Sequence, residues 1–92
     1  MTIYVMLTVD LNRGVNEDAR DKFNQHMKDK LWAKLKLTTT WQARFAEGVT
    51  PDSAISTAKS DVRNAAANAG IAYYEAAIQA GTSAPTIWNQ LD

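Results

Sequence analysis

The alternation of side chains over residues 3–11 constrains the fold of this chain more than any other feature. Every second residue from Ile3 to Leu11 is aliphatic, and the residues between them are of mixed character. A two-residue period is typical of a β-strand with one buried face, because successive side chains of a strand point to opposite sides. The segment therefore predicts a first strand, with Asp10 at its tip and a turn at residues 12–14.

A helix is expected next. Apolar residues recur every four positions from Ala19 to Leu31, and this spacing places them on one side of a helix over about 17–31. Asn16 precedes two acids, and asparagine is a favoured N-cap that accepts a hydrogen bond from the first turn. The pattern predicts an amphipathic helix that begins after Asn16.

A second helix is predicted between Thr50 and Gly70. Thr50 is suited to the N-cap position, Pro51 to the first helical position and Gly70 to the residue that follows the last turn. The apolar stripe of this helix is expected to be Ile55, Ala58, Val62, Ala65 and Ala69.

Two further segments have the composition of strands. Residues 34–46 alternate with a period of two and are rich in threonine and aromatic side chains. This is long for one strand, so the segment either bends near residues 38–40 or divides into two. Residues 71–80 predict another strand, and residues 86–91 form either a short helix or an added strand.

The order strand, helix, strand, helix, strand indicates an α+β fold in a single domain, residues 1–92. Two helices that pack on one face of a small antiparallel or mixed sheet form a two-layer sandwich, and the ferredoxin-like βαββαβ arrangement is the closest common form. Trp41 and Trp88 are expected to be core or partly buried anchors. The predicted core also includes Leu7, Val9, Phe23, Met27, Ile55 and Val62.

Composition excludes several classes of function. Hydrophobic residues make up 46% and charged residues 22% of the chain, as in ordinary globular domains. There is no cysteine, so disulfides and thiolate chemistry are absent. No apolar run is long enough to span a membrane, and no basic leader precedes the first strand. A cytoplasmic protein without a membrane association is expected, and no motif indicates a nucleotide cofactor.

Charge is balanced overall but unevenly distributed. Residues 1–46 hold eight basic and five acidic side chains, and residues 47–92 hold two basic and five acidic ones. A net charge of zero does not favour nucleic-acid binding, which normally needs a basic excess. The uneven distribution still allows a local basic surface.

The sheet face opposite the helices is predicted to be decorated rather than apolar. Small sheets with one bare face often pair with a second copy. We therefore expect a homodimer or another protein partner at this face, and the alternative is a solvated face without a partner. The residues expected at the interface are Tyr4, Met6, Thr8, Thr40 and Gln42. The same face is expected to carry Asp10, Lys36, Thr38, Arg44, Tyr73, Glu75 and Gln79.

Asp10 is the candidate catalytic and metal-binding residue. A hard divalent cation needs carboxylate oxygens, and a strand tip can present one to solvent. The alternative is an Asx-turn with the backbone near Asn12. His26, the only histidine, lies one position from the helical stripe and is interpreted as a surface residue rather than a general base.

A basic cluster is the candidate nucleic-acid-binding surface. Trp32 lies among these residues and would be placed to stack a base. The alternative is a set of solvated charges around the end of the first helix. The candidate residues are Lys28, Lys30, Lys34, Lys36 and Arg44.

The pattern of a first strand ending Val9-Asp10-Leu11-Asn12, a helix, and a strand written Leu-Thr-Thr-Thr-Trp at 37–41 resembles a superfamily of small ferredoxin-like proteins. It includes the CRISPR-associated small endonuclease subunit and virulence-associated protein D. The resemblance covers about residues 3–80. It implies a homodimer and, for the nucleases of that superfamily, a divalent metal on the acid that ends the first strand.

Only Asp10 falls on that metal-binding position. Gln42, Arg44 and Phe45 match the basic and aromatic residues of the superfamily's second strand loosely. Three functions are therefore carried forward. The first is a dimeric interaction protein without catalysis or cofactor, which uses its bare sheet face or an edge strand. The second is a nuclease that uses Mg²⁺ or Mn²⁺ on Asp10, and the third is a small nucleic-acid-binding regulator.

Overall fold

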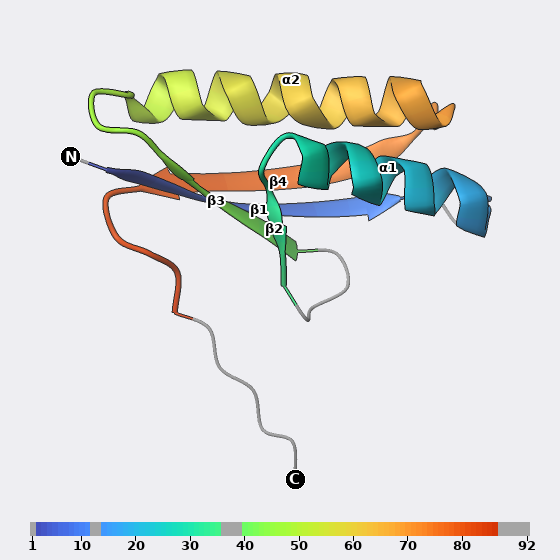
Figure 1. The fold of residues 1–92 in the computed structure, drawn as a ribbon, viewed down its shortest axis with the longest axis horizontal. Helices are drawn as coiled ribbons and strands as arrows, with labels where there is room; N and C mark the ends of the chain where they lie inside the picture. Colours follow the sequence, from blue (N-terminus) through green and yellow to red (C-terminus); the bar gives the residue numbers. More distant parts are fainter. Residues whose placement is uncertain (1, 12–13, 36–39, 87–92) are drawn as a thin grey trace, which may run out of the picture.

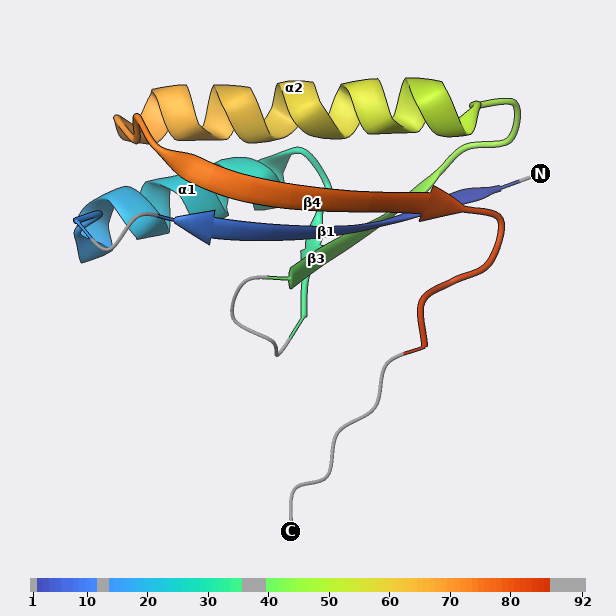
Figure 2. The same cartoon turned by 180° about the vertical axis from the view of Figure 1, so that it is seen from behind.

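The computed structural model describes residues 2–11, 14–35 and 40–86 and has the predicted α+β architecture. Two helices cover one face of a sheet, and the other face is open (Figures 1 and 2). The elements follow in the order β1 (Ile3–Leu11), α1 (Glu17–Asp29), β2 (Ala33–Lys34), β3 (Thr40–Phe45), α2 (Pro51–Ala69) and β4 (Tyr74–Gly81).

The sheet is antiparallel, with strand order β2-β3-β1-β4. This order and the βαββαβ sequence of elements are those of the ferredoxin-like fold, so the predicted fold class is confirmed. The segment 34–46 divides into two strands rather than bending as one, and residues 36–39 of the connection between them lie outside the described ranges.

The alternation in β1 produces the expected two faces. Ile3, Val5, Leu7 and Val9 are buried beneath the helices, and β1 is central, paired with β3 on one side and β4 on the other. Phe23 and Met27 of α1 pack into the same core, as predicted, and so does Trp41 of β3. Trp88, the other predicted anchor, lies outside the described residues.

The predicted core position of Ile55 is wrong. Ala54, Ala58, Val62, Ala65 and Ala66 are the buried residues of α2, and Ile55 is only half-buried. The reason is the phase of the helix: the buried side chains at 54, 58, 62 and 65 follow one stripe, and Ile55 lies at its margin. Because most of these residues are alanines, α2 can approach the sheet closely.

Both helices begin and end with specific hydrogen bonds. The Asn16 side chain accepts from the backbone N–H of Ala19 at 2.8 Å, and Thr50 accepts from Ser53 at 3.1 Å, which confirms both predicted N-caps. Gly70 ends α2 in the left-handed region at φ 72°. The residue after it, Ile71, donates to the carbonyl of Ala66 at 2.8 Å, which is the bonding of a Schellman motif.

The first helix is shorter than predicted because the same motif ends it earlier. Leu31 adopts φ 70° and is 86% exposed, so it does not belong to the apolar stripe. The N–H of Trp32 donates to Met27 at 3.1 Å, and that of Leu31 donates to Lys28 at 2.9 Å. The reversal turns Trp32 into the core, where it is 3% exposed.

Candidate functional site

The open sheet face gathers side chains from three strands into rows. The central strand β1 contributes Tyr4, Met6, Thr8 and Asp10 to this face. On the β3 side, these pair with Arg44, Gln42 and Thr40 in turn. On the β4 side, Met6, Thr8 and Asp10 pair with Gln79, Ala77 and Glu75. All five predicted interface residues therefore lie on one face, as the alternation of β1 and β3 indicates. Their role in an interface stays a prediction.

The centre of this face is partly apolar and shallow. Met6 is 38% exposed, which is unusual for a methionine in the middle of a central strand. Next to it, the hydroxyls of Thr8 and Thr40 lie 3.5 Å apart, and Thr40 is buried. A hollow of about 340 Å³ lies where the chain leaves β4, between Tyr4, Met6 and Pro85.

Opposite charges lie at opposite ends of the same face. Arg44 lies beside Tyr4, near the beginning of β1, and its side chain is exposed. Asp10 lies near the end of β1, and its registered partner on β4 is Glu75, so two carboxylates share that end. Neighbouring strands are about 4.8 Å apart, and like charges directly opposite each other are unfavourable.

Asp10 is the only residue that the sequence suggested as a metal ligand, and it is exposed. Glu75 is the second carboxylate near it, which the sequence analysis placed on the same face. In the described ranges, no group of three or more histidine, cysteine or acidic side chains is close enough together to hold a metal ion. The alternative Asx-turn involves Asn12, which lies outside those ranges.

The predicted basic cluster is spread over different sides of the molecule. Lys28 and Lys30 are exposed around the end of α1, and Arg44 lies on the open sheet face. Lys34 lies on the helix-covered side, because its registered partner is the buried Trp41. Lys36 lies outside the described residues. The strand alternation does not continue from β2 to β3, since Ala33 rather than Lys34 pairs with the open-face Gln42.

Trp32 has a structural role, and the interpretation of its ring as a stacking surface for a base is wrong. Its indole Nε1 donates to a carboxylate oxygen of Asp61 on α2 at 2.9 Å, and its ring meets Phe45 edge to face with centroids 6.3 Å apart. A ring that is 3% exposed offers no face to a nucleic acid. It instead joins the end of α1 to α2.

His26 is half-buried rather than on the surface. Its Nε2 atom is buried and has no hydrogen-bond partner among the residues that the structure describes. In the described ranges, no hydrogen bond joins the ring to an acid or a nucleophile.

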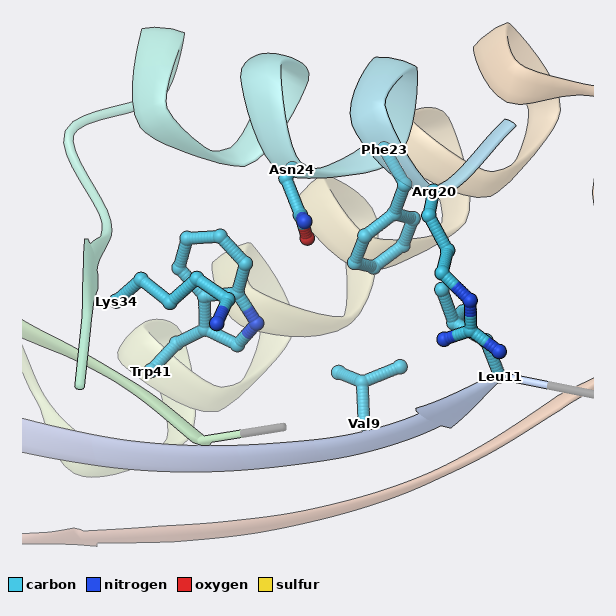
Figure 3. A pocket seen from close by; sticks show the side chains of 7 residues that line it. All are labelled: Val9, Leu11, Arg20, Phe23, Asn24, Lys34 and Trp41. Atoms are coloured by element: carbon cyan, nitrogen blue, oxygen red, sulfur yellow. The ribbon is translucent and has the colours of Figure 1, made fainter. Parts of the chain in front are cut away.

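A cavity of about 190 Å³ lies between α1 and the sheet, near the end of β1 (Figure 3). Its apolar walls are Val9, Leu11, Phe23 and Trp41. Its polar side chains are Arg20, Asn24 and Lys34. This cavity was not predicted from the sequence. The four-residue spacing of Arg20 and Asn24, which puts both on one side of a helix beside Phe23, was the available signal.

Comparison with known proteins identifies no relative of this chain. No protein-family model matches it, and no curated protein or solved structure is significantly similar to it. The ferredoxin-like topology is assigned from the order and pairing of the strands alone. In the described ranges, neither helix is long and apolar enough to cross a membrane.

Proposed function

We propose that this protein is a small homodimeric interaction module without catalytic activity, which pairs with a second copy through its open sheet face. The observation that carries the proposal is the distribution of charge on that face. Arg44 lies at one end, Asp10 and Glu75 lie at the other, and Met6 lies between them. The hollow lies at the Arg44 end, beside Tyr4 and Met6.

This distribution favours one arrangement of two copies. If the two-fold axis lies in the plane between the sheets and perpendicular to the strands, the strands of the two copies run in opposite directions. The Arg44 end of each copy then lies over the Asp10 end of the other, and the same contact is made twice. An exposed methionine at the centre of each face provides an apolar contact, and charges at the rim specify the arrangement.

The alternative two-fold axis, parallel to the strands, gives the opposite electrostatic result. It brings Asp10 and Glu75 of both copies to the same end, where four carboxylates repel one another. That repulsion disfavours the second arrangement unless a cation neutralises it.

The test is the dimer dissociation constant of charge variants, measured by sedimentation equilibrium at low salt. Arg44→Glu should weaken the dimer about 10-fold, since two rim contacts each change by roughly 0.5–1 kcal/mol. The double variant Arg44→Glu with Asp10→Lys should recover at least part of that loss. The matched control is Lys22→Glu on the exposed side of α1, which should leave dissociation unchanged.

A strict monomer at high micromolar concentration contradicts the proposed dimer. A dimer whose affinity does not respond to Arg44→Glu contradicts the proposed arrangement. A double variant that recovers none of the affinity lost in Arg44→Glu contradicts the proposed contact between Arg44 of one copy and Asp10 of the other.

The pairing of Asp10 with Glu75 favours a second candidate, a metal-dependent nuclease of the superfamily that the sequence resembles. With the parallel axis, Mg²⁺ or Mn²⁺ would relieve the repulsion between the carboxylates and stabilise the dimer. Mn²⁺-dependent cleavage of RNA or DNA that is lost in Asp10→Asn, while circular dichroism shows an unchanged fold, would establish this candidate. Under the first proposal, Asp10→Asn has no effect on any metal response.

A further inference from the structure

We propose that the cavity between α1 and the sheet binds a small organic carboxylate with an apolar or aromatic body. The cavity lies on the helix-covered side of the sheet, so it is separate from the open face (Figures 1 and 3). The proposal is independent of the dimer and rests on the combination of polar and apolar groups around this space.

Two cationic side chains border the cavity from different elements. Arg20 extends from α1 toward the end of β1, and Lys34 extends from β2 over the ring of Trp41, with its Nζ 5.9 Å from the ring centroid (Figure 3). Both residues are half-buried, and neither forms an ion pair with any residue of the described ranges. Partly desolvated cations without a counter-ion attract an anion, because the protein has already lost part of their hydration.

Asn24 adds a neutral hydrogen-bonding group between the two cations. It lies one helical turn after Arg20, and its amide points from α1 toward the strands (Figure 3). An arginine fork, an ammonium group and an amide can each donate to a carboxylate oxygen, and an arginine can bind a carboxylate in a bidentate manner.

The remaining walls require an apolar ligand body. Val9, Phe23 and Trp41 form apolar walls that are each no more than 2% exposed, and Leu11, the fourth apolar wall, is half-buried. The volume of about 190 Å³ is below the ~300–1,000 Å³ that is typical of pockets for drug-sized ligands. A ligand of about the size of benzoate or a single apolar amino acid therefore fits the space, and a bare inorganic anion would leave the apolar walls unfilled.

The test is titration of the isotope-labelled protein with sodium benzoate, followed by the backbone amide and Trp41 indole resonances. Saturable shifts are expected at Trp41 and along α1, with a dissociation constant in about the millimolar range for so small a probe. Benzyl alcohol, which has the ring without the charge, should bind at least 10-fold more weakly. Inorganic phosphate, which has charge without a ring, should do the same.

Variants connect the binding to the two cations. Arg20→Gln and Lys34→Gln should each weaken benzoate binding about 5- to 10-fold, whereas the matched control Lys22→Gln, an exposed cation on the same helix, should not change it. Circular dichroism of each variant shows whether the fold is retained, and Lys34→Arg keeps the charge if a glutamine variant is unstable.

Three results would overturn the proposal. The first is the absence of saturable shifts up to about 50 mM benzoate, a concentration well above the dissociation constant expected for this probe. The second is equal affinity for benzoate and benzyl alcohol, which would mean that the charges contribute nothing. The third is tighter binding of phosphate than of benzoate, which would make the cavity a simple anion site.

Discussion

Replacing Leu31 by glycine should stabilise this protein, although it removes a hydrophobic side chain. Leu31 has φ 70°, in the left-handed region where a Cβ atom crowds the following carbonyl at a cost of about 1–2 kcal/mol. The leucine is 86% exposed, so little buried area is lost. Glycine also gives the unfolded chain more freedom, which offsets about 0.4–1 kcal/mol. The net expectation is a gain of about 0.5–1 kcal/mol.

The assay is urea unfolding at a fixed protein concentration, supported by a rise in Tm of roughly 3–6 °C, as this gain implies for a domain of this size. Leu31→Ala is the first control, because it keeps the Cβ and should remain within about 0.5 kcal/mol of wild type. Gly70→Ala is the second: it ends α2 with the same hydrogen bonds at φ 72°, and no atom lies within 4 Å of an added Cβ. It should lose about 1 kcal/mol through backbone conformation alone. A Leu31→Gly variant less stable than wild type, beside a destabilised Gly70→Ala, would refute the reasoning.

Two further substitutions test the core. Phe23→Ala should lower the free energy of unfolding, measured in urea, by about 3–5 kcal/mol because the ring is 1% exposed. Ile55→Ala, at a half-buried position, should lower it clearly less. A Phe23→Ala stability within ~0.5 kcal/mol of wild type would contradict the burial of the ring. Trp32→Phe should lower the free energy of unfolding by about 1–3 kcal/mol because the half-buried Asp61 carboxylate loses its 2.9 Å hydrogen bond. Asp61→Asn keeps an acceptor and should lower it less. Equal losses in the two variants would show that this hydrogen bond contributes little.

The fold was predictable where local signals and tertiary packing agree. The alternation of β1, the caps Asn16 and Thr50 and the left-handed Gly70 each specify backbone geometry through short-range chemistry, and the structure has all of them. The βαββαβ order then leaves few arrangements, since the helices must cover one face of the sheet.

The differences arise where a long-range contact determines the local structure. Nothing near Leu31 in the sequence indicates a left-handed residue, because a leucine at the end of an apolar stripe predicts a further helical turn. The helix ends there so that Trp32 can reach Asp61 and Phe45, which are distant in sequence. The sheet face on which Lys34 lies could not be predicted for a similar reason, because the register of β2 against β3 determines it.

The candidate sites were predictable to different degrees for the same physical reason. A sheet face follows from alternation within strands, so Tyr4, Met6 and Thr8 could be assigned to one surface from the sequence. A cavity needs side chains from several elements at known depth, so Arg20, Asn24 and Lys34 could be brought together only by the structure.

The sheet itself makes the two proposals separable by experiment. Arg44 and Asp10 lie on its open face, whereas Arg20 and Lys34 border the cavity on the side that the helices cover. Substitutions at distant sites without shared partners usually act additively. Arg44→Glu should therefore change dimer affinity and leave benzoate binding intact, and Arg20→Gln should do the reverse. If either variant alters both measurements, the dimer contacts reach the helix side, and the arrangement of two stacked open faces is wrong.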